Sequence, residues 1–254
     1  MKRSLLPLLA LLPVLSLVAC SDDESASDTT SGITAAAPLT DASTTSQGST
    51  IASEPASDGD MVTFTAEVWA DNWFSLYVNG ELVGEDSVPI TTERSFNAET
   101  ITFTATYPLT IAMVAKDFKE DDSGLEYIGT DRQQMGDGGV IVQITDTSTG
   151  QVVGTSSAAW RGLVIHRAPL NTDCASSADP ISECEHEILA EPEGWTTAGF
   201  DDSAWPAASV YTADEVGAKD GYTTITWSAD AALIWTSDLK VDNTILWRTT
   251  VAAP

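Results

Sequence analysis

The sequence predicts an all-β protein whose folded part is an antiparallel β-sandwich. Residues 62–69 alternate apolar and polar side chains, as a strand with one buried face does. Asn79-Gly80 is typical of a two-residue hairpin turn, because both residues tolerate a positive φ angle. Short apolar runs bounded by Gly, Asp and Pro then recur along the chain, and none keeps a helical period over three turns. Regular short strands of this kind are typical of two packed sheets.

Each strand can be assigned from its own pattern. The first is expected at 62–69, and it places Val62, Phe64, Ala66 and Val68 toward the core. A hairpin at 73–84 follows. Its alternation puts Phe74, Leu76 and Val78 on the core face and Trp73, Ser75 and Tyr77 on the other face. Further strands are expected at 101–105, 109–115, 140–144 and 151–153.

The first 19 residues read as a targeting segment. Lys2-Arg3 precede an apolar run at 5–18 that is too short to span a membrane comfortably. The run ends in Leu17-Val18-Ala19-Cys20, which resembles the lipobox of bacterial lipoproteins. This resemblance implies cleavage before Cys20 and acylation of that cysteine. An ordinary secretory signal followed by an unrelated cysteine is the alternative.

Residues 20–60 are expected to form a disordered acidic tether. Ser, Thr, Ala, Asp and Gly dominate this segment, and it contains no aromatic residue. Such a composition cannot offset the entropy of ordering. Ser21 follows the cysteine, which by analogy with lipoprotein sorting favours the outer membrane of a Gram-negative bacterium. The lipid anchor is then the expected contact with the membrane.

The charge of the chain excludes some classes of partner. It carries 11 basic and 38 acidic residues, a formal net charge of -27. A chain this acidic cannot neutralise nucleic-acid phosphates, and anionic lipid surfaces are disfavoured for the same reason. We therefore expect no nucleic-acid partner.

Two acidic loops raise the question of calcium. Residues 116–127 are rich in Asp and Glu, and a Gly-Asp-Gly-Gly run follows at 136–139. Calcium requires six to eight oxygen ligands, which such loops can supply, although the spacing does not match an EF-hand. A solvated loop with tight glycine turns is the alternative. The predicted calcium ligands are Asp121, Asp122, Glu126 and Asp137.

The other two cysteines, Cys174 and Cys184, are expected to form a disulfide, because an even pair in an exported protein usually does. A metal site that includes His186 is the alternative. His166 is the only other histidine, and the chain has no C-x-x-C motif, so few further ligands are visible.

The strongest resemblance lies in residues 194–206, G-W-T-T-A-G-F-D-D-S-A-W-P. This run resembles the W, then F-D-D-S-x-W element of galactose-binding-like β-sandwich (jelly-roll) domains. The same families carry L-Y-V-N-G-x-x-V-G, which stands here at 76–84. The segments 232–235 and 243–251 resemble the closing strands, so the resemblance covers residues 61–254. It implies a jelly-roll fold, which serves as carbohydrate-binding module, adhesive domain or spacer.

These motifs also have a purely structural interpretation. Trp195, Phe200 and Trp205 can fasten a long connection onto the sandwich, and Asp201-Asp202-Ser203 can form an Asx-type turn. Among the other tryptophans, Trp69 and Trp73 fall on the face of their strands that alternation predicts to be wetter. Aromatic rings of that kind either stack on the apolar face of a sugar or cover the sheet edge. The predicted sugar site comprises Trp69, Asp71, Asn72, Trp73, Lys116, Asp117 and Glu126.

Three functions remain open from the sequence. The first is a non-catalytic surface lipoprotein that binds a glycan. The second is a structural or adhesive module that binds an extracellular protein. The third is a glycoside hydrolase that uses a pair of carboxylates. The chain has no G-x-S-x-G motif, and two histidines offer little for a Ser-His-Asp system, so we expect no enzyme, with the glycoside hydrolase as the alternative.

Overall fold

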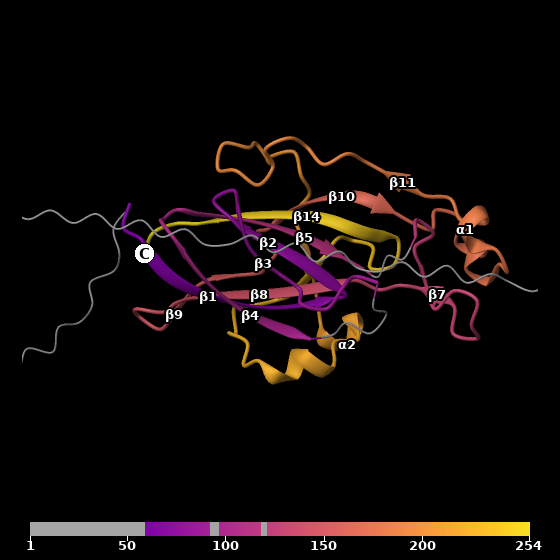
Figure 1. Ribbon diagram of the computed structural model, residues 1–254, viewed down its shortest axis with the longest axis horizontal. Coiled ribbons are helices and arrows are strands. Elements are labelled where there is room, and N and C mark those ends of the chain that lie inside the picture. The colour runs from indigo at the N-terminus through magenta and orange to yellow at the C-terminus, as the bar shows by residue number, and fades with distance from the viewer. Residues whose placement is uncertain (1–58, 92–96, 118–120) are drawn as a thin grey trace, which may run out of the picture. The chain divides into compact units, whose positions relative to one another are not determined.

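A computed structural model describes residues 59–91, 97–117 and 121–254 (Figure 1). The predicted signal peptide, Cys20 and residues 21–58 of the predicted tether lie outside the described residues. The described part is mostly β-strand, and every strand pair in it is antiparallel. The predicted all-β class is therefore confirmed.

Two sheets pack face to face, as the layers in Figure 1 show. Sheet A has the order β12-β13-β8-β1-β4, and β9 pairs with β8 beside this path. Its strands are β1 (Val62–Asp71), β4 (Ala98–Ala105), β8 (Gly139–Asp146), β9 (Gln151–Thr155), β12 (Ser209–Tyr211) and β13 (Leu233–Trp235).

Sheet B has the order β11-β10-β14-β5-β2-β3. The five strands expected at 62–69, 101–105, 109–115, 140–144 and 151–153 all lie within observed strands, whereas the strands at Arg161–Arg167, Glu187–Ile188 and Ser209–Tyr211 were not predicted. The strands of sheet B are β2 (Trp73–Val78), β3 (Glu81–Glu85), β5 (Leu109–Lys116), β10 (Arg161–Arg167), β11 (Glu187–Ile188) and β14 (Asp242–Val251).

Short elements connect and cover the sheets. A two-stranded ribbon pairs β6 with β7, and the helices are all brief. Their bounds are β6 (Leu125–Glu126), β7 (Gln134–Met135), η1 (Thr172–Ser176), α1 (Pro180–Glu183), α2 (Ala213–Val216) and η2 (Asp220–Thr224). Within the described ranges, no helix is long and apolar enough to cross a membrane.

The core lies between the sheets and follows the alternation of the strands. Phe74, Leu76 and Val78 are buried in it, as predicted. The inward residues of β1 are buried in the same cluster and confirm the second expectation: Val62, Phe64, Ala66 and Val68. Alternation therefore identified the core faces of both strands correctly.

The predicted Asn79-Gly80 turn joins β2 to β3. Both residues have positive φ angles, 52° and 92°. The Asn79 side chain also holds the turn against the connection from β4 to β5, because its Oδ1 accepts from the Thr110 N–H (2.8 Å) and its Nδ2 donates to the Thr106 carbonyl (3.0 Å). The asparagine thus serves both the turn conformation and the packing of the turn.

The outer face of sheet B is covered by the strap, which we define as residues 190–206. Trp195, Phe200 and Trp205 of the strap pack against the apolar residues that β5, β10 and β14 present on this face. The structural interpretation of the F-D-D-S-x-W element is thus supported, because its aromatic residues fasten this connection onto the sheet. The outer face of sheet A is covered in turn by the segment that contains α2 and η2.

Asp86, just after the hairpin, gives a prediction about pH. It is 5% exposed, and burial raises the pKa of its carboxyl from 3.8 to about 6. The folded protein thus holds this proton more tightly than the unfolded chain. The stability that this group contributes is complete below about pH 4 and is lost as the pH rises through about 6.

We expect Asp86→Asn to raise the free energy of unfolding at pH 7.5 by about 1–2 kcal/mol, a value discounted for partial solvent screening. At pH 4 the change should be small, because the native carboxyl is then already neutral. Urea unfolding of both proteins at the two pH values measures this difference. An equal change at both pH values would contradict the assignment.

Candidate functional site

A groove runs between the edge of sheet B formed by β10 and β11 and the edge of sheet A formed by β12 and β13. It encloses a cavity of about 440 Å³. This volume lies in the range of small-molecule sites, which are mainly apolar with a few placed polar groups. Its lining residues are Gly162, Leu163, Val164, Arg167, Glu187, Leu189, Pro206, Ala207, Ser209, Thr236, Ser237, Asp242 and Trp247.

The groove exists because strand pairing along the outer edge of β10 is interrupted. At its start, the Gly162 N–H donates to the Pro206 carbonyl (2.9 Å), which ties β10 to the end of the strap. Further along, the Leu189 N–H donates to the Ile165 carbonyl (2.8 Å), where the segment of β11 begins to cover the edge. The groove opens between these two attachments.

An aromatic ring forms the floor of the groove. Trp247 of β14 is 1% exposed and lines the groove beneath Gly162. A Cβ atom at position 162 would come within 2.4 Å of the Trp247 ring, so only glycine allows this close approach. The ring is thereby fixed between Gly162 and the core.

A charged pair forms one end of the groove. Arg167 Nε donates to Asp242 Oδ1 (2.7 Å), and Asp242 Oδ2 accepts from the Thr236 hydroxyl (2.6 Å). The hydrogen bond to Asp242, and then its charge, raise the pKa of the Arg167 guanidinium. Both carboxylate oxygens are thus engaged, whereas the two terminal nitrogens of Arg167 make no hydrogen bond to a described residue.

The Arg167 side chain is 44% exposed, so these terminal nitrogens are open to a ligand. Glu187, Ser209 and Ser237 add further hydrogen-bonding groups along the groove walls. The groove therefore combines a recessed aromatic floor with donors and acceptors at its rim. It can hold a neutral molecule that has both an apolar face and hydroxyl groups.

The predicted sugar platform of Trp69 and Trp73 is not formed. Trp69 is fully buried under Tyr222, with ring centroids 5.6 Å apart, so the expectation that it lies on a wet face is wrong. The segment of α2 and η2 covers that face of sheet A. Trp73 is half-buried, and Lys116 Nζ lies 4.9 Å from its ring centre, as a cation–π pair.

Four of the five polar residues of that predicted site are buried rather than open to a ligand in solution. Asp71, Asn72, Asp117 and Glu126 are each at most 6% exposed. Burial, followed by the charges of Asp137 and Glu126, raises the pKa of the Asp71 carboxyl. The prediction therefore grouped residues that do lie in one region, but this region is the interior of the protein and not its surface.

The four predicted calcium ligands do not form a metal site of their own. Asp121 Oδ1 accepts from the Ser123 N–H (2.8 Å), an Asx-type turn, and Glu126 Oε2 accepts from Gln134 Nε2 (3.1 Å). Burial raises the pKa of the Asp137 carboxyl, and the charges of Lys219 and Lys240 oppose this rise only in part. Within residues 59–91, 97–117 and 121–254, no three His, Cys, Asp or Glu side chains converge on a possible metal position.

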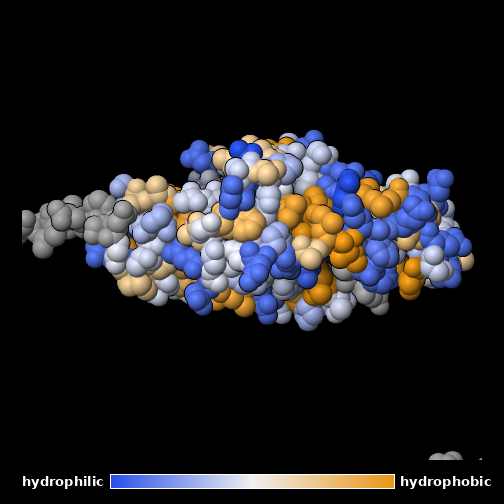
Figure 2. All heavy atoms as spheres, turned by 90° about the horizontal axis from the view of Figure 1, so that it is seen from above, coloured by the Kyte–Doolittle hydropathy of each residue, from blue (hydrophilic) through white to orange (hydrophobic). Residues whose placement is uncertain are grey.

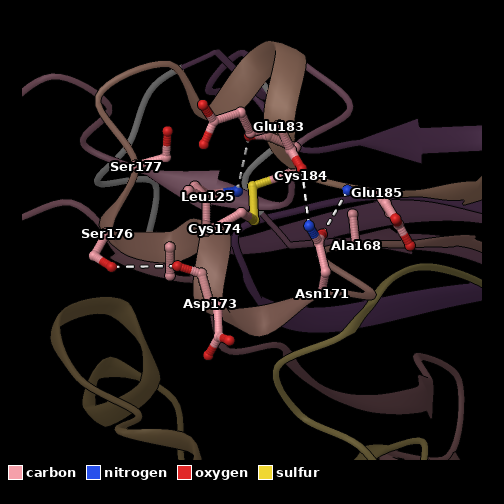
Figure 3. Close-up of a disulfide and its surroundings, with 12 residues drawn as sticks. Leu125, Ala168, Asn171, Asp173, Cys174, Ser176, Ser177, Glu183, Cys184 and Glu185 are labelled. Carbon is pink, nitrogen blue, oxygen red and sulfur yellow. Dashed lines mark hydrogen bonds between the residues drawn. A yellow bond between two sulfur atoms is a disulfide. The ribbon is translucent and has the colours of Figure 1, made fainter.

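The predicted disulfide between Cys174 and Cys184 is confirmed (Figure 3). The alternative metal site with His186 is therefore wrong, because both sulfurs are bonded to each other. The disulfide packs against Leu125 in a small cluster of its own. The Asn171 side chain braces the loop by donating to the Glu183 carbonyl (2.8 Å) and accepting from the Glu185 N–H (2.6 Å).

The groove residues were missed at the sequence level. Arg167 and Asp242 are separated by 75 positions, and no local pattern links them. Trp247 was recognisable from the sequence as an aromatic residue of a predicted closing strand. Its place beneath Gly162 depends on the pairing of β10 with β14, which the sequence did not predict. Comparison of the chain with protein-family models, with curated proteins and with solved structures found no match.

Proposed function

We propose that this chain is a non-catalytic, lipid-anchored binding protein of the bacterial outer membrane, and that it binds carbohydrate in the groove. Acylation of Cys20 would supply the anchor, as its lipobox-like context implies. The observation that carries the proposal is the position of Arg167, which Asp242 holds by Nε at one end of the groove whose floor is Trp247. Its terminal nitrogens can donate to sugar hydroxyls while the sugar's apolar face meets the groove.

The charges of the groove support a neutral glycan. One guanidinium is accompanied there by two carboxylates, Asp242 and Glu187, in a chain of net charge -27. An acidic saccharide would meet repulsion that Arg167 alone does not offset. A neutral saccharide would meet donors and acceptors side by side, as its hydroxyls require.

The same geometry favours binding over hydrolysis. A glycosidase of the usual kind needs two carboxyl groups on either side of the scissile bond, one of them free to take and give a proton. Asp242 is hydrogen-bonded to Arg167 and Thr236. Glu187 is therefore the one groove carboxylate that can act as an acid or base toward a ligand. A carboxylate pair is thus not offered to a ligand in the groove.

We expect Arg167→Met to weaken glycan binding by at least about tenfold, because a hydrogen bond from a charged donor contributes about 1.5–3 kcal/mol. A glycan array with the full-length mature chain carrying Cys20→Ser would identify ligands, and calorimetry would measure their affinity. Arg132→Met is the matched control. It removes an arginine that packs on the Tyr127 ring and does not line the groove.

Three outcomes would contradict the proposal. An array without signal, with the protein folded, would contradict glycan binding. A glycan affinity that is unchanged in Arg167→Met would show that the glycan binds outside the groove. Hydrolysis of a glycoside that disappears in Glu187→Gln would revive the enzyme hypothesis.

A specific observation also favours a protein ligand as the second candidate. Ile188, Leu189 and Val210 are 52%, 45% and 53% exposed, and they lie on or beside the strands that border the groove. Figure 2 shows apolar residues gathered into a patch among hydrophilic ones on the face seen from above Figure 1. Exposed apolar patches of this kind often mark protein contacts.

This second candidate predicts a different response to mutation. Ile188→Ser together with Val210→Ser should abolish capture of an extracellular protein partner, because both lost side chains are exposed. Glycan affinity should stay within about twofold, since neither residue lines the groove. Surface plasmon resonance with each ligand class would distinguish the two candidates.

A further inference from the structure

Three polar side chains form a row across the end of sheet B. They are Asn72 just before β2, Asp117 just after β5 and Asn243 in β14. The Asn72 N–H donates to the Lys116 carbonyl and the Asp117 N–H donates to the Asn243 carbonyl, both at 2.8 Å. These bonds continue the registers of β2 with β5 and of β14 with β5 by one residue.

The row lies on the core face of the sheet. Phe74, Ala115 and Ile245 are each two residues from a member of the row, and all three are buried in the core. Alternate residues of a strand share a face, so the row continues the core at its end. Directly opposed side chains on neighbouring strands are about 5 Å apart at their Cβ atoms. The three side chains therefore project side by side.

Both asparagines are fully buried and incompletely satisfied. Asn243 Nδ2 donates to the Ala168 carbonyl (2.7 Å) and to the Val241 carbonyl (3.3 Å). These acceptors fix which end of the amide is nitrogen, because an oxygen in its place would meet two carbonyl oxygens. Asn243 Oδ1 is left without a hydrogen-bond partner among the described residues, as are both side-chain polar atoms of Asn72.

Such groups need a partner. An unsatisfied buried polar atom costs about 1–3 kcal/mol, and native proteins satisfy nearly all of them. Asn243 offers an oxygen, and Asn72 offers an oxygen as well as an amide nitrogen. A cation can serve both oxygens at once, since amide oxygens are ordinary ligands of hard cations.

The surroundings supply negative charge and a shaped wall. Asp117 is 1% exposed, and a Cβ atom on Gly136 would lie 2.0 Å from its Oδ2, so only a glycine lets the main chain pass so close to this carboxylate. Asp71 is the chain neighbour of Asn72 and lies within electrostatic reach of Glu126. Buried carboxylates are stabilised by a bound cation.

We propose that Asn72 Oδ1, the Asp117 carboxylate and Asn243 Oδ1 bind a hard divalent cation of the calcium class at the end of sheet B. The site differs from the predicted one at Asp121, Asp122, Glu126 and Asp137, because two of its three side-chain ligands are amides. None of its three side-chain ligands lines the groove, although Asn243 directly follows the groove residue Asp242.

The test uses the full-length mature chain carrying Cys20→Ser, stripped with EDTA and dialysed into metal-free buffer. Calcium alone is then added, and the melting temperature and calorimetric heat are recorded. We expect a saturable rise of about 5–10 °C, because a cation that binds only the folded state stabilises it by mass action. Asp117→Asn should weaken calcium binding by at least about tenfold.

Two variants keep the test decisive. Asn72→Asp preserves side-chain shape and adds a carboxylate, so it should tighten calcium binding even if Asp117→Asn does not fold. Asp121→Asn is the matched control, and it should leave the response unchanged.

Three results would overturn the proposal. One is a folded protein with no thermal or calorimetric response to calcium, which would mean that water and not a cation satisfies the three side chains. The second is a response lost in Asp121→Asn but kept in Asp117→Asn and unaltered in Asn72→Asp. The third is an equal response to the same concentration of sodium ion.

Discussion

Replacing Arg248 by Met is expected to lower the free energy of unfolding by about 3–5 kcal/mol, the range for breaking a buried charged pair. Arg248 is 3% exposed in β14 and reaches the strap with all three guanidinium nitrogens. Its Nε donates to Asp202 Oδ2 (2.8 Å), and its terminal nitrogens donate to the carbonyls of Trp195 and Thr197. Met fills similar space but leaves these acceptors without a donor.

Arg167→Met is the matched control for stability, because it also removes an arginine–aspartate pair. The Arg167 side chain is 44% exposed, against 4% for Arg248, so its loss should cost about 1 kcal/mol or less. Urea unfolding followed by tryptophan fluorescence measures both variants, and it also reports on Trp195 and Trp205 in the strap. A loss for Arg248→Met no greater than that for Arg167→Met would show that the strap contributes little to global stability.

Arg248 also shows why the F-D-D-S-x-W element could be interpreted only in part from sequence. The aromatic residues and the Asx turn indicated a fastened connection, which the packing of the strap supports. The residue that Asp202 binds lies 46 positions further along the chain. Nothing in the local pattern of the motif identifies that partner.

Alternation identified the strand residues that face the core between the sheets, but it could not identify where a later segment covers the outer face. Alternation placed Phe74 and Leu76 in the core correctly. It placed Trp69 on a wet face, but Tyr222 of η2 packs on it from more than 150 positions later. A strand buried on both faces loses the contrast on which alternation depends.

The groove was unpredictable for a related reason. Its lining comes from five separate segments, and its position depends on where the edges of two different sheets diverge. The strand that carries Arg167 has the sequence R-G-L-V-I-H-R, with charges at both ends and a bulge near His166, so it lacks a regular alternation. Several predicted polar residues did lie together, because Asp71-Asn72 and Asp117 flank strands that pair.

Removing the disulfide by Cys174→Ala with Cys184→Ala should lower the free energy of unfolding by about 2–3 kcal/mol. The bridged residues are 10 positions apart, and a closed loop of this size restricts the unfolded chain by about that amount. Calorimetry of the double variant in the Cys20→Ser background measures the loss. Dithiothreitol should lower the melting temperature of the parent protein and leave that of the double variant unchanged.

Removing the disulfide should loosen the groove as well as the cluster around the two cysteines. Asn171 ties the bridged loop to Glu183 and Glu185, and the chain then continues directly into β11, whose Glu187 lines the groove. Loosening the loop therefore loosens one groove wall, while Arg167 and Trp247 remain fixed by β14. We expect glycan affinity to fall a few-fold on reduction, less than in Arg167→Met. An affinity unchanged by dithiothreitol would show that β11 holds the wall without help from the disulfide, through its own pairing with β10.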